Sequence, residues 1–421
     1  MLNDSGELNL NGNSLSLTKE NGQSSLSGTL IGSEESELKL AQGAALTVSD
    51  SADISGMEGT YDLTAGDNTL EFAFNSNKAI SNGSIKDGNI VKSGAGLLTI
   101  GFDMLSSEDA SLSSLEVKQG AVAFDGWNDN SLNLRSVNLE SNTVFNFTGK
   151  ELNAKDGFAA NNATVNFFAN SSLDHVITGA VSGSGNTFDL TADGSFKSQS
   201  LTIDKLASGS DNTFVVGIDN TGAIPQVSQI IINEAEGHVT QRVDLAYVHG
   251  NYDFSDTLTF ATVKGTNAQG VEFVGSDESL PSNVVRADRT TVISAITPAY
   301  NITSNNNADQ SVNWGFERNT AYDEISIVGD VMTDMANTVY ASNVYLDTLN
   351  KRMGEARYVN GEDYGVWARV RHDSFNLDRT ETMKTMAQVG LTQKNEFANG
   401  DWFVGAAFDY QSADSNYDRM N

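Results

Sequence analysis

The stretch Leu349–Val370, LNKRMGEARYVNGEDYGVWARV, divides the chain into two kinds of sequence. It begins as the positively charged end of a helix and turns through Asn360-Gly361. It continues as a strand with two different faces, because successive side chains of a strand point in opposite directions. The two alternating sets are Val366, Ala368 and Val370, and Trp367, Arg369 and Arg371. The sequence before this stretch is long, acidic and rich in Gly, Asn and Ser, whereas alternating strands follow it.

Residues 1 to about 200 contain short alternating runs separated by Gly, Asn, Ser and Asp. Short strands bounded by turn residues are typical of all-β structure. Clear examples are Leu38-Lys39-Leu40, Leu70-Glu71-Phe72, Val144-Phe145-Asn146-Phe147 and Val165-Asn166-Phe167. No helical period of about 10 residues or more interrupts these runs, so strand–helix–strand units are not expected.

Weak internal repetition indicates a parallel β-helix rather than a sandwich. Ala180–Phe188, AVSGSGNTF, recurs as Leu206–Phe214, LASGSDNTF, about 26 residues later. That offset suits one turn of a three-faced coil, and the strands are shorter than the roughly 5–6 residues usual in sandwiches. We expect Gly and Asn at left-handed corners, Asn stacked on Asn in the next turn, and Leu, Val, Ile and Phe inside. At about 25 residues per turn, residues 1–318 would make about 12 turns.

Residues 201–318 contain longer strands, which we interpret as a cap on the solenoid. They include Ile230-Ile231-Ile232-Asn233, Leu258–Val263 and a closing Val312–Phe316. An open solenoid end exposes backbone edges and core residues, and a cap prevents end-to-end stacking.

From Glu324 the periodicity becomes helical. The apolar residues recur at spacings that place them on one helix face, and they are Val331, Met335, Val339, Leu346, Leu349 and Met353. We predict a helix over residues 325–357. Its C-terminal end carries Lys351, Arg352 and Arg357, which suit the negative end of the helix dipole.

Residues 362–421 predict antiparallel strands with one apolar face and one polar or small face. The apolar sets are Val366, Ala368 and Val370; Ala387, Val389 and Leu391; and Trp402, Val404, Ala406, Phe408 and Tyr410. This alternation, with aromatic residues near strand ends, is typical of transmembrane β-barrels. Three strands cannot close a barrel, which needs at least about eight, so we expect a truncated one. The N-terminus has no signal-peptide pattern, and we expect the chain to be a fragment cut at both ends.

Composition narrows the function classes. The 421 residues include no cysteine, which excludes disulfides and thiolate chemistry. The formal charge of −30 repels phosphates, so we expect no nucleic-acid partner. No apolar run approaches the roughly 18 residues of a transmembrane helix.

The sequence carries no recognisable catalytic constellation. None of its four histidines, His175, His238, His249 and His372, lies in a metal-ligand or H-E-x-x-H spacing. No G-x-S-x-G elbow, P-loop or dinucleotide fingerprint is present. The acidic clusters Glu34–Glu37 and Asp50–Asp53 lack the G-G-x-G-x-D repeat of calcium-binding rolls. We therefore expect no enzyme activity and no catalytic, cofactor-binding or metal-ligating residues.

Two parts of the chain resemble one protein family. Val91–Ile100, VKSGAGLLTI, followed by Leu115–Ala123, LEVKQGAVA, resembles the passenger-associated repeat of autotransporters, K-x-G-x-G-x-L-x-L and then V-x-x-G-x-L. Ile100 and Val122 stand roughly where that pattern has Leu. Leu349–Gly354, together with Gly365–Arg369, Ala387–Leu391 and Asp401–Gly405, is similar to the linker and first barrel strands of the same family.

The resemblance implies a right-handed parallel β-helix passenger (1–200), a C-terminal autochaperone-like cap (201–318), a linker helix and the start of an outer-membrane barrel. It also implies self-secretion by the type V route and cell-surface display of a pertactin-like adhesin or aggregation factor. Its partners would be outer-membrane lipid, the barrel-assembly machinery and a ligand on a host or neighbouring cell. Some family members cleave between two Asn residues before the linker; this chain has Asp347 and Thr348 there, so we expect the passenger either to stay attached or to be cut by other means.

Two other functions fit the same layout. The solenoid would serve as the stalk of a protease- or lipase-bearing passenger if a globular catalytic domain lay upstream. A free β-helix, either a glycan-active enzyme or a phage-tail fibre, would have no membrane strands.

Overall fold

The computed structural model describes residues 6–105, 112–125, 131–168, 174–192, 194, 199–254, 256–288, 294–343, 364–377 and 380–417. Strands make up 60% of it, so the predicted all-β class is confirmed. The chain divides into two compact units, Met1–Ile293 with Thr297–Glu324, and Ser294–Ile296 with Ile325–Asn421.

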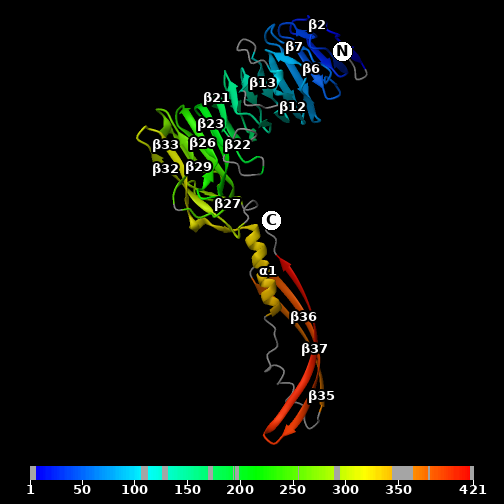
Figure 1. Cartoon of the computed structure of the whole chain (residues 1–421), viewed down its shortest axis with the longest axis vertical. Helices are drawn as coiled ribbons and strands as arrows, with labels where there is room; N and C mark the ends of the chain where they lie inside the picture. Colours follow the sequence, from blue (N-terminus) through cyan, green and yellow to red (C-terminus); the bar gives the residue numbers. More distant parts are fainter. Residues whose placement is uncertain are drawn as a thin grey trace. The chain divides into compact units, whose positions relative to one another are not determined.

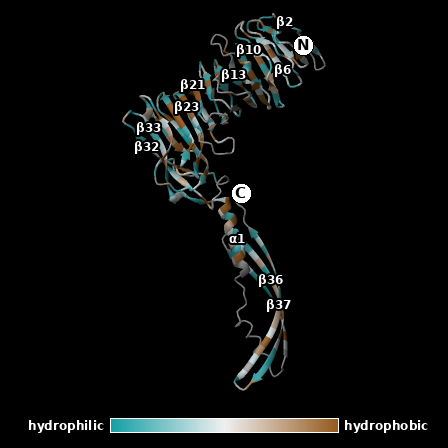
Figure 2. Cartoon of the chain, viewed as in Figure 1, coloured by the Kyte–Doolittle hydropathy of each residue, from teal (hydrophilic) through white to brown (hydrophobic). Residues whose placement is uncertain are grey.

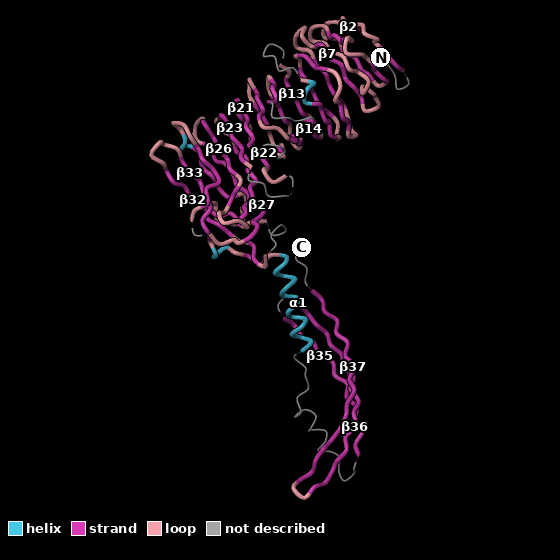
Figure 3. Tube along the Cα trace, in the orientation of Figure 1, coloured by secondary structure: helices cyan, strands magenta, loops and turns pink. Residues whose placement is uncertain are grey.

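The first unit is a β-solenoid in which parallel strands stack on three faces (Figures 1 and 3). The first face contains β3 (Gln23–Leu26), β6 (Ala45–Ser49), β8 (Thr69–Ala73), β11 (Asn89–Ser93), β13 (Ser114–Val117), β16 (Val137–Leu139), β19 (Phe158–Ala160), β21 (Asp174–Ser182), β23 (Ser200–Leu206), β26 (Gln229–Ala235) and β28 (Leu258–Val263). The second contains β9 (Lys78–Ile80), β12 (Leu97–Gly101), β14 (Ala121–Asp125), β17 (Val144–Phe147), β20 (Thr164–Phe167), β22 (Ser184–Asp189), β24 (Asp211–Asn220), β27 (Val239–Gly250) and β29 (Val271–Gly275). The third contains β2 (Ser14–Leu17), β5 (Glu37–Leu40), β7 (Thr60–Asp62) and β10 (Ser84–Lys86), and then β15 (Ser131–Leu134) and β18 (Glu151–Ala154).

Short elements complete this part of the chain. They are β1 (Glu7–Asn9), β4 (Thr29–Ile31), β25 (Gln226–Val227), β31 (Ile296–Thr297), β34 (Glu324–Ile325) and the 3-10 turns Phe102–Met104, Ala268–Gly270 and Thr320–Tyr322.

The first face stacks eleven parallel strands, one for each turn that reaches it, whereas the sequence predicted about 12 turns. Early turns match the expected length: hydrogen bonds between equivalent side chains span 24 residues at Thr47–Glu71 and 20 at Asn133–Asn153. Later turns are longer: the hydrogen bond from Asn212 to Gln241 spans 29 residues. The final strands of the region are antiparallel and add no turns. The repeat between Ala180–Phe188 and Leu206–Phe214 is confirmed, since β22 pairs with β24 through Asn186–Asn212 and Phe188–Phe214.

Strand alternation places the apolar side chains inside, as predicted. In β6, for example, Leu46 and Val48 are buried while their neighbours face outward. Phenylalanine rings form a column in the core: Phe158, Phe188 and Phe214 follow one another with ring centres 6.3 and 5.4 Å apart. Each ring fills the space between successive turns, so the turns are held by contacts that repeat along the axis.

Corners of the solenoid use Asn and Gly in the left-handed conformation, as expected. Asn142 and Asn162 have φ of 63° and 50°, values that Asn tolerates better than most residues. The predicted Asn stacking is also confirmed: Asn186 donates to Asn212, and Asn212 donates to Gln241, at 2.9 and 3.1 Å. Because these amides are buried, their mutual hydrogen bonds remove a desolvation cost.

Antiparallel strands follow the last parallel turn. They are β30 (Val284–Arg286), β32 (Ala299–Asn306) and β33 (Val312–Arg318), and β33 pairs with β28. Arg318 fastens them: its guanidinium donates twice to Asp323 at 2.6 Å and once to Asp253 at 2.9 Å. The guanidinium carbon lies 5.3 Å from the ring centre of Tyr252 and 5.6 Å from that of Tyr300. Hydrogen bonding to Asp323 raises the pKa of Arg318, so the guanidinium stays charged.

In the second unit, the described residues from Ile327 onward form a helix and an antiparallel sheet. Helix α1 spans Ile327–Asn343, and Ser326 caps it by accepting a hydrogen bond from Gly329 N at 3.1 Å. The sheet has the order β35 (Tyr364–Leu377), β36 (Thr380–Phe397) and β37 (Gly400–Tyr417), all antiparallel. The predicted continuation of the helix to residue 357, the turn at Asn360-Gly361, and Asp347 and Thr348 lie outside the described residues.

Candidate functional site

The sheet β35–β37 has the opposite polarity to the solenoid. In β36 the buried positions are largely polar and include Thr382, Lys384 and Gln388, while Val389 and Leu391 are exposed. Val366 in β35 and Phe408 in β37 are 79% and 73% exposed. Large apolar side chains that face solvent over three adjacent strands are unusual for a water-soluble surface.

Strand register gathers these exposed side chains into one continuous patch, the apolar band. Cross-strand neighbours form the rows Val366–Leu391–Ala406, Ala368–Val389–Phe408 and Val370–Ala387–Tyr410, and β37 extends the patch through Val404 and Trp402. The next row on the same face is His372–Thr385–Ser412, where the apolar character ends. From Trp402 to Tyr410 the band covers about 25 Å along the strand, with an aromatic ring at each end.

Several polar groups on the opposite face of the sheet form hydrogen bonds with one another. Arg369 donates to Gln388 Oε1 at 3.1 Å, and Arg371 Nε donates to Asp373 at 2.6 Å. The Trp367 ring covers Gly390, where an added Cβ would lie 2.3 Å from the ring atoms. Trp367 Nε1 also donates to Thr392 at 3.2 Å. This face therefore carries the polar contacts of the sheet, and Gly390 is required by the ring that covers it.

Helix α1 approaches the same polar face. Thr380 Oγ1 donates to Asp334 at 3.0 Å and lies 3.4 Å from Asn337 Nδ2. Three residues of the predicted apolar stripe, Val331, Met335 and Val339, are exposed and so do not pack on the sheet. Figure 2 shows that helix α1 carries hydrophobic residues. Leu346, Leu349 and Met353 of the predicted stripe lie outside the described residues, and within them the contact with the sheet uses polar side chains of the helix.

The histidines do not form catalytic pairs with their acidic neighbours in sequence. His175 is buried and contacts Gly149 O at 2.6 Å and Gln199 Oε1 at 3.0 Å, while Asp174 is exposed. Burial lowers the pKa of His175. His372 and Asp373 are consecutive strand residues on opposite faces of β35. Within the described ranges, no group of three or more His, Asp or Glu side chains is placed to hold a metal ion.

The acidic cluster Asp50–Asp53 serves the backbone. Asp50 accepts hydrogen bonds from the N–H groups of Asn75 and Ser76 at 3.1 and 3.0 Å, and from the Ser76 hydroxyl at 2.7 Å. The bond from the Ser76 backbone is the main reason that the pKa of Asp50 is lowered. Asp53 accepts in the same way from Ser55. These carboxylates therefore organise turns of the solenoid.

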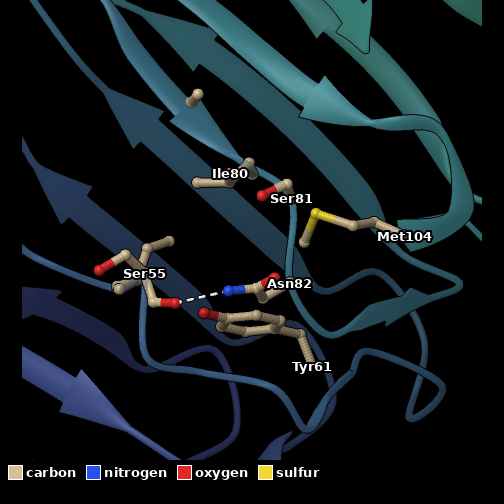
Figure 4. Close-up of a pocket in the computed structure, with 8 residues that line it drawn as sticks. Ser55, Tyr61, Ile80, Ser81, Asn82 and Met104 are labelled. Carbon is tan, nitrogen blue, oxygen red and sulfur yellow. Dashed lines mark hydrogen bonds between the residues drawn. The ribbon is translucent and has the colours of Figure 1, made fainter. Parts of the chain in front are cut away.

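A small cavity of about 30 Å³ lies inside the early turns (Figure 4). Its lining includes Ser55, Tyr61, Ser81, Asn82 and Met104, and Asn82 donates to Ser55 O at 2.8 Å. Burial raises the pKa of Tyr61, so its phenol stays protonated. A water molecule needs roughly 10–15 Å³ on this scale, so the cavity has room for water but not for a sugar ring.

No protein-family model matches the chain. None of the described helices combines the length and apolar character that a membrane-crossing helix requires.

Sequence patterns identified both faces of the sheet but missed three functional arrangements. The buried polar positions of β36 before Ala387 were not recognised, although Thr380, Thr382 and Lys384 alternate with exposed residues. The contacts of Asp334 with Thr380 and of Arg318 with Asp253 could not be predicted from periodicity. Each of them joins residues that are distant in sequence.

Proposed function

We propose that β35–β37 form part of a β-barrel in a bacterial outer membrane, and that the chain belongs to an autotransporter displaying its solenoid at the cell surface. The observation that carries the proposal is the inverted sheet, with an apolar band exposed on three strands and a polar face that is buried in β36. In a bilayer the band would contact acyl chains, and the polar face would line the barrel interior.

The dimensions of the band support this assignment. A transmembrane strand tilted by about 45° needs about 9–11 residues, and outer-membrane barrels carry aromatic residues at both boundaries of their apolar belt. The band on β37, residues 402–410, is nine residues long. Trp402 and Tyr410 stand at the two ends of the band on β37. A closed ring has at least about eight strands, so β35 and β37 need further strands as neighbours.

The solenoid fits the role of the displayed part. Its right-handed turns would fold outside the cell, where the antiparallel cap, fastened by Arg318, closes the end of the stack. We assign it adhesion or aggregation rather than catalysis, and we expect its partners to be lipid, the barrel-assembly machinery and a cell-surface ligand. Two observations support this assignment. The core is repetitive, and His175, Asp50 and Asp53 make hydrogen bonds within the solenoid.

A cysteine scan tests the membrane assignment, because the chain has no cysteine of its own. Val389→Cys and Phe408→Cys place a single thiol on the apolar band, while Gln388→Cys and Ala407→Cys place one on the opposite face. Each thiol is labelled with an environment-sensitive fluorophore, and dodecylphosphocholine micelles are added.

The proposal predicts a blue shift for positions 389 and 408 and none for their immediate neighbours 388 and 407. Equal responses at all four positions would show that the apolar band is not an acyl-chain surface. In cells that make the protein, the solenoid should be digested by externally added protease while the sheet stays with the outer-membrane fraction.

A further inference from the structure

One lysine lies inside the solenoid. Lys92, in β11, occupies an inward position whose neighbours on β8 and β13 are Phe72 and Val117. All three side chains are fully buried, at 0% exposure. The aliphatic stem of Lys92 therefore occupies a place that the adjacent turns give to apolar residues.

The ammonium group of Lys92 is surrounded by backbone oxygens. Nζ lies 3.1 Å from Phe74 O, 2.7 Å from Ser93 O, 2.5 Å from Gly94 O and 3.3 Å from Gln119 O. Phe74 follows β8, Ser93 and Gly94 end β11, and Gln119 follows β13, so the oxygens come from three consecutive turns. An ammonium has three N–H donors and no acceptor, which suits a cage made of carbonyls.

Glycines allow these carbonyls to converge. Gly94 has φ of 80°, and a Cβ there would lie 2.6 Å from Phe74 O. Gly120 has φ of 76°, and a Cβ there would lie 2.5 Å from both Gly94 O and Gly96 O. Any other residue at these positions would displace oxygens of the cage or their immediate neighbours. The K-x-G-x-G spacing thus places the ammonium group of Lys92 next to the glycine corner at Gly94.

We propose that the carbonyl cage around Lys92 is a cation-binding site that the chain fills with its own ammonium group, and that this internal ligand fastens three turns together. Phe74 O also accepts from Gly96 N, and Ser93 O accepts from Phe74 N, so two of the oxygens have a second donor. Loss of the ammonium would weaken the corner between β8 and β13. The inference is independent of the proposed membrane function.

Hydrogen exchange of the full 421-residue chain tests the fastening. Lys92→Met keeps the apolar stem but removes the ammonium, and Lys86→Met, at an exposed position in β10, is the matched control. We expect backbone amides of β8, β11 and β13 to exchange about 10- to 100-fold faster in the Lys92 variant, because hydrogen bonds from a charged donor are lost. The control variant and the amides of β27 should match the unchanged chain. Equal protection in both variants would overturn the proposal.

Chemical rescue tests the cation site itself. Lys92→Ala removes the atoms of n-propylammonium, so n-propylammonium chloride should restore protection of β8, β11 and β13. Tetramethylammonium chloride at equal ionic strength has the charge but no N–H donor, and it should not. Absence of rescue, or equal rescue by both salts, would refute an ammonium-selective cage.

Amine labelling of the unchanged chain needs no variant and remains decisive if Lys92→Ala does not fold. With an acylating reagent, Lys92 should react at least about 100-fold more slowly than exposed Lys86, because its amine is reached only after the turns open. Reaction of both lysines at the same rate would contradict the proposal.

Discussion

The solenoid and the C-terminal sheet are both built from alternating strands, yet they place their apolar side chains on opposite sides. In the solenoid, Val48 and Phe188 are completely buried and polar neighbours face outward. In the sheet, Lys384 and Gln388 are buried and Val366 is exposed. The same alternation along a strand therefore places apolar side chains inside the solenoid but on the exposed face of the sheet.

The largest contrast should come from removing one aromatic ring in each region. Phe188→Ala empties a position in the ring column and should lower the free energy of unfolding by about 3–5 kcal/mol. Phe408→Ala removes an exposed ring and should not change unfolding measurably in water. Urea unfolding followed by circular dichroism gives both values, and a similar loss for the two variants would mean that the ring of Phe408 is packed in solution.

A charge on the apolar band should have the next largest effect, and only in lipid. Val389→Arg lies in the central row of the band and should weaken bilayer association by about 2–4 kcal/mol. Thr385→Arg, on the same face of the same strand but beyond the band, should have a much smaller effect. Partitioning into lipid vesicles measures the difference. A shift of equal size at the two positions would mean that the band is not centred on that row.

Two ion pairs of the solenoid should differ in how much they stabilise it, because Arg318–Asp323 is largely buried and Lys205–Glu236 is exposed. Arg318→Met leaves Asp323 without its double hydrogen bond and should destabilise the solenoid by about 2–4 kcal/mol, because the Arg318 side chain is only 11% exposed. Lys205→Met removes a pair with Glu236 in which both side chains are well exposed, and its effect should be close to measurement error. Denaturant unfolding compares the variants, and high salt should reduce only the small effect.

Acid should lower the free energy of unfolding of the solenoid through His175. We expect this effect to be the smallest of the four predictions. Burial lowers its folded pKa below the unfolded value, so below about pH 6.5 the unfolded chain takes up a proton first. The stabilisation is complete above about pH 6.5 and is lost as pH falls through the folded pKa. Unfolding midpoints at pH 7.5 and 5.5 should differ by less in His175→Gln than in the unchanged chain. His238→Asn, at an exposed position, should show the full difference.

Much of the architecture followed from local sequence patterns. Alternation within short runs predicted which residues of the solenoid are inside, and Asn and Gly predicted the corners. The two faces of β35 and β37 were also assigned correctly from Val366 to Tyr410. These features depend on the spacing of neighbours along one strand, which a sequence displays directly.

The remaining features depend on residues from different turns. The variation in turn length was not predicted: the turn linking Asn133 to Asn153 spans 20 residues, and the one linking Asn212 to Gln241 spans 29. Lys92 belongs to the K-x-G-x-G motif, but the carbonyl oxygens around its ammonium group come from residues up to 27 positions away. The polar contact of α1 with Thr380 contradicts the usual expectation that a helix packs through its apolar stripe. No pattern within one element contains that information.

The apolar band lies off-centre along the strands, which gives the sheet a direction. β37 has 18 residues, and its apolar side chains end at Tyr410, well before the strand ends at Tyr417. The remaining residues would extend roughly 20 Å beyond the hydrocarbon on one side only. At the other side, the tight connection between Phe397 and Gly400 would lie near the headgroups. If the proposed membrane role holds, the long rim would carry charged Glu381 and Asp414 into water beyond the headgroups, whereas the short rim would end at the Phe397–Gly400 connection.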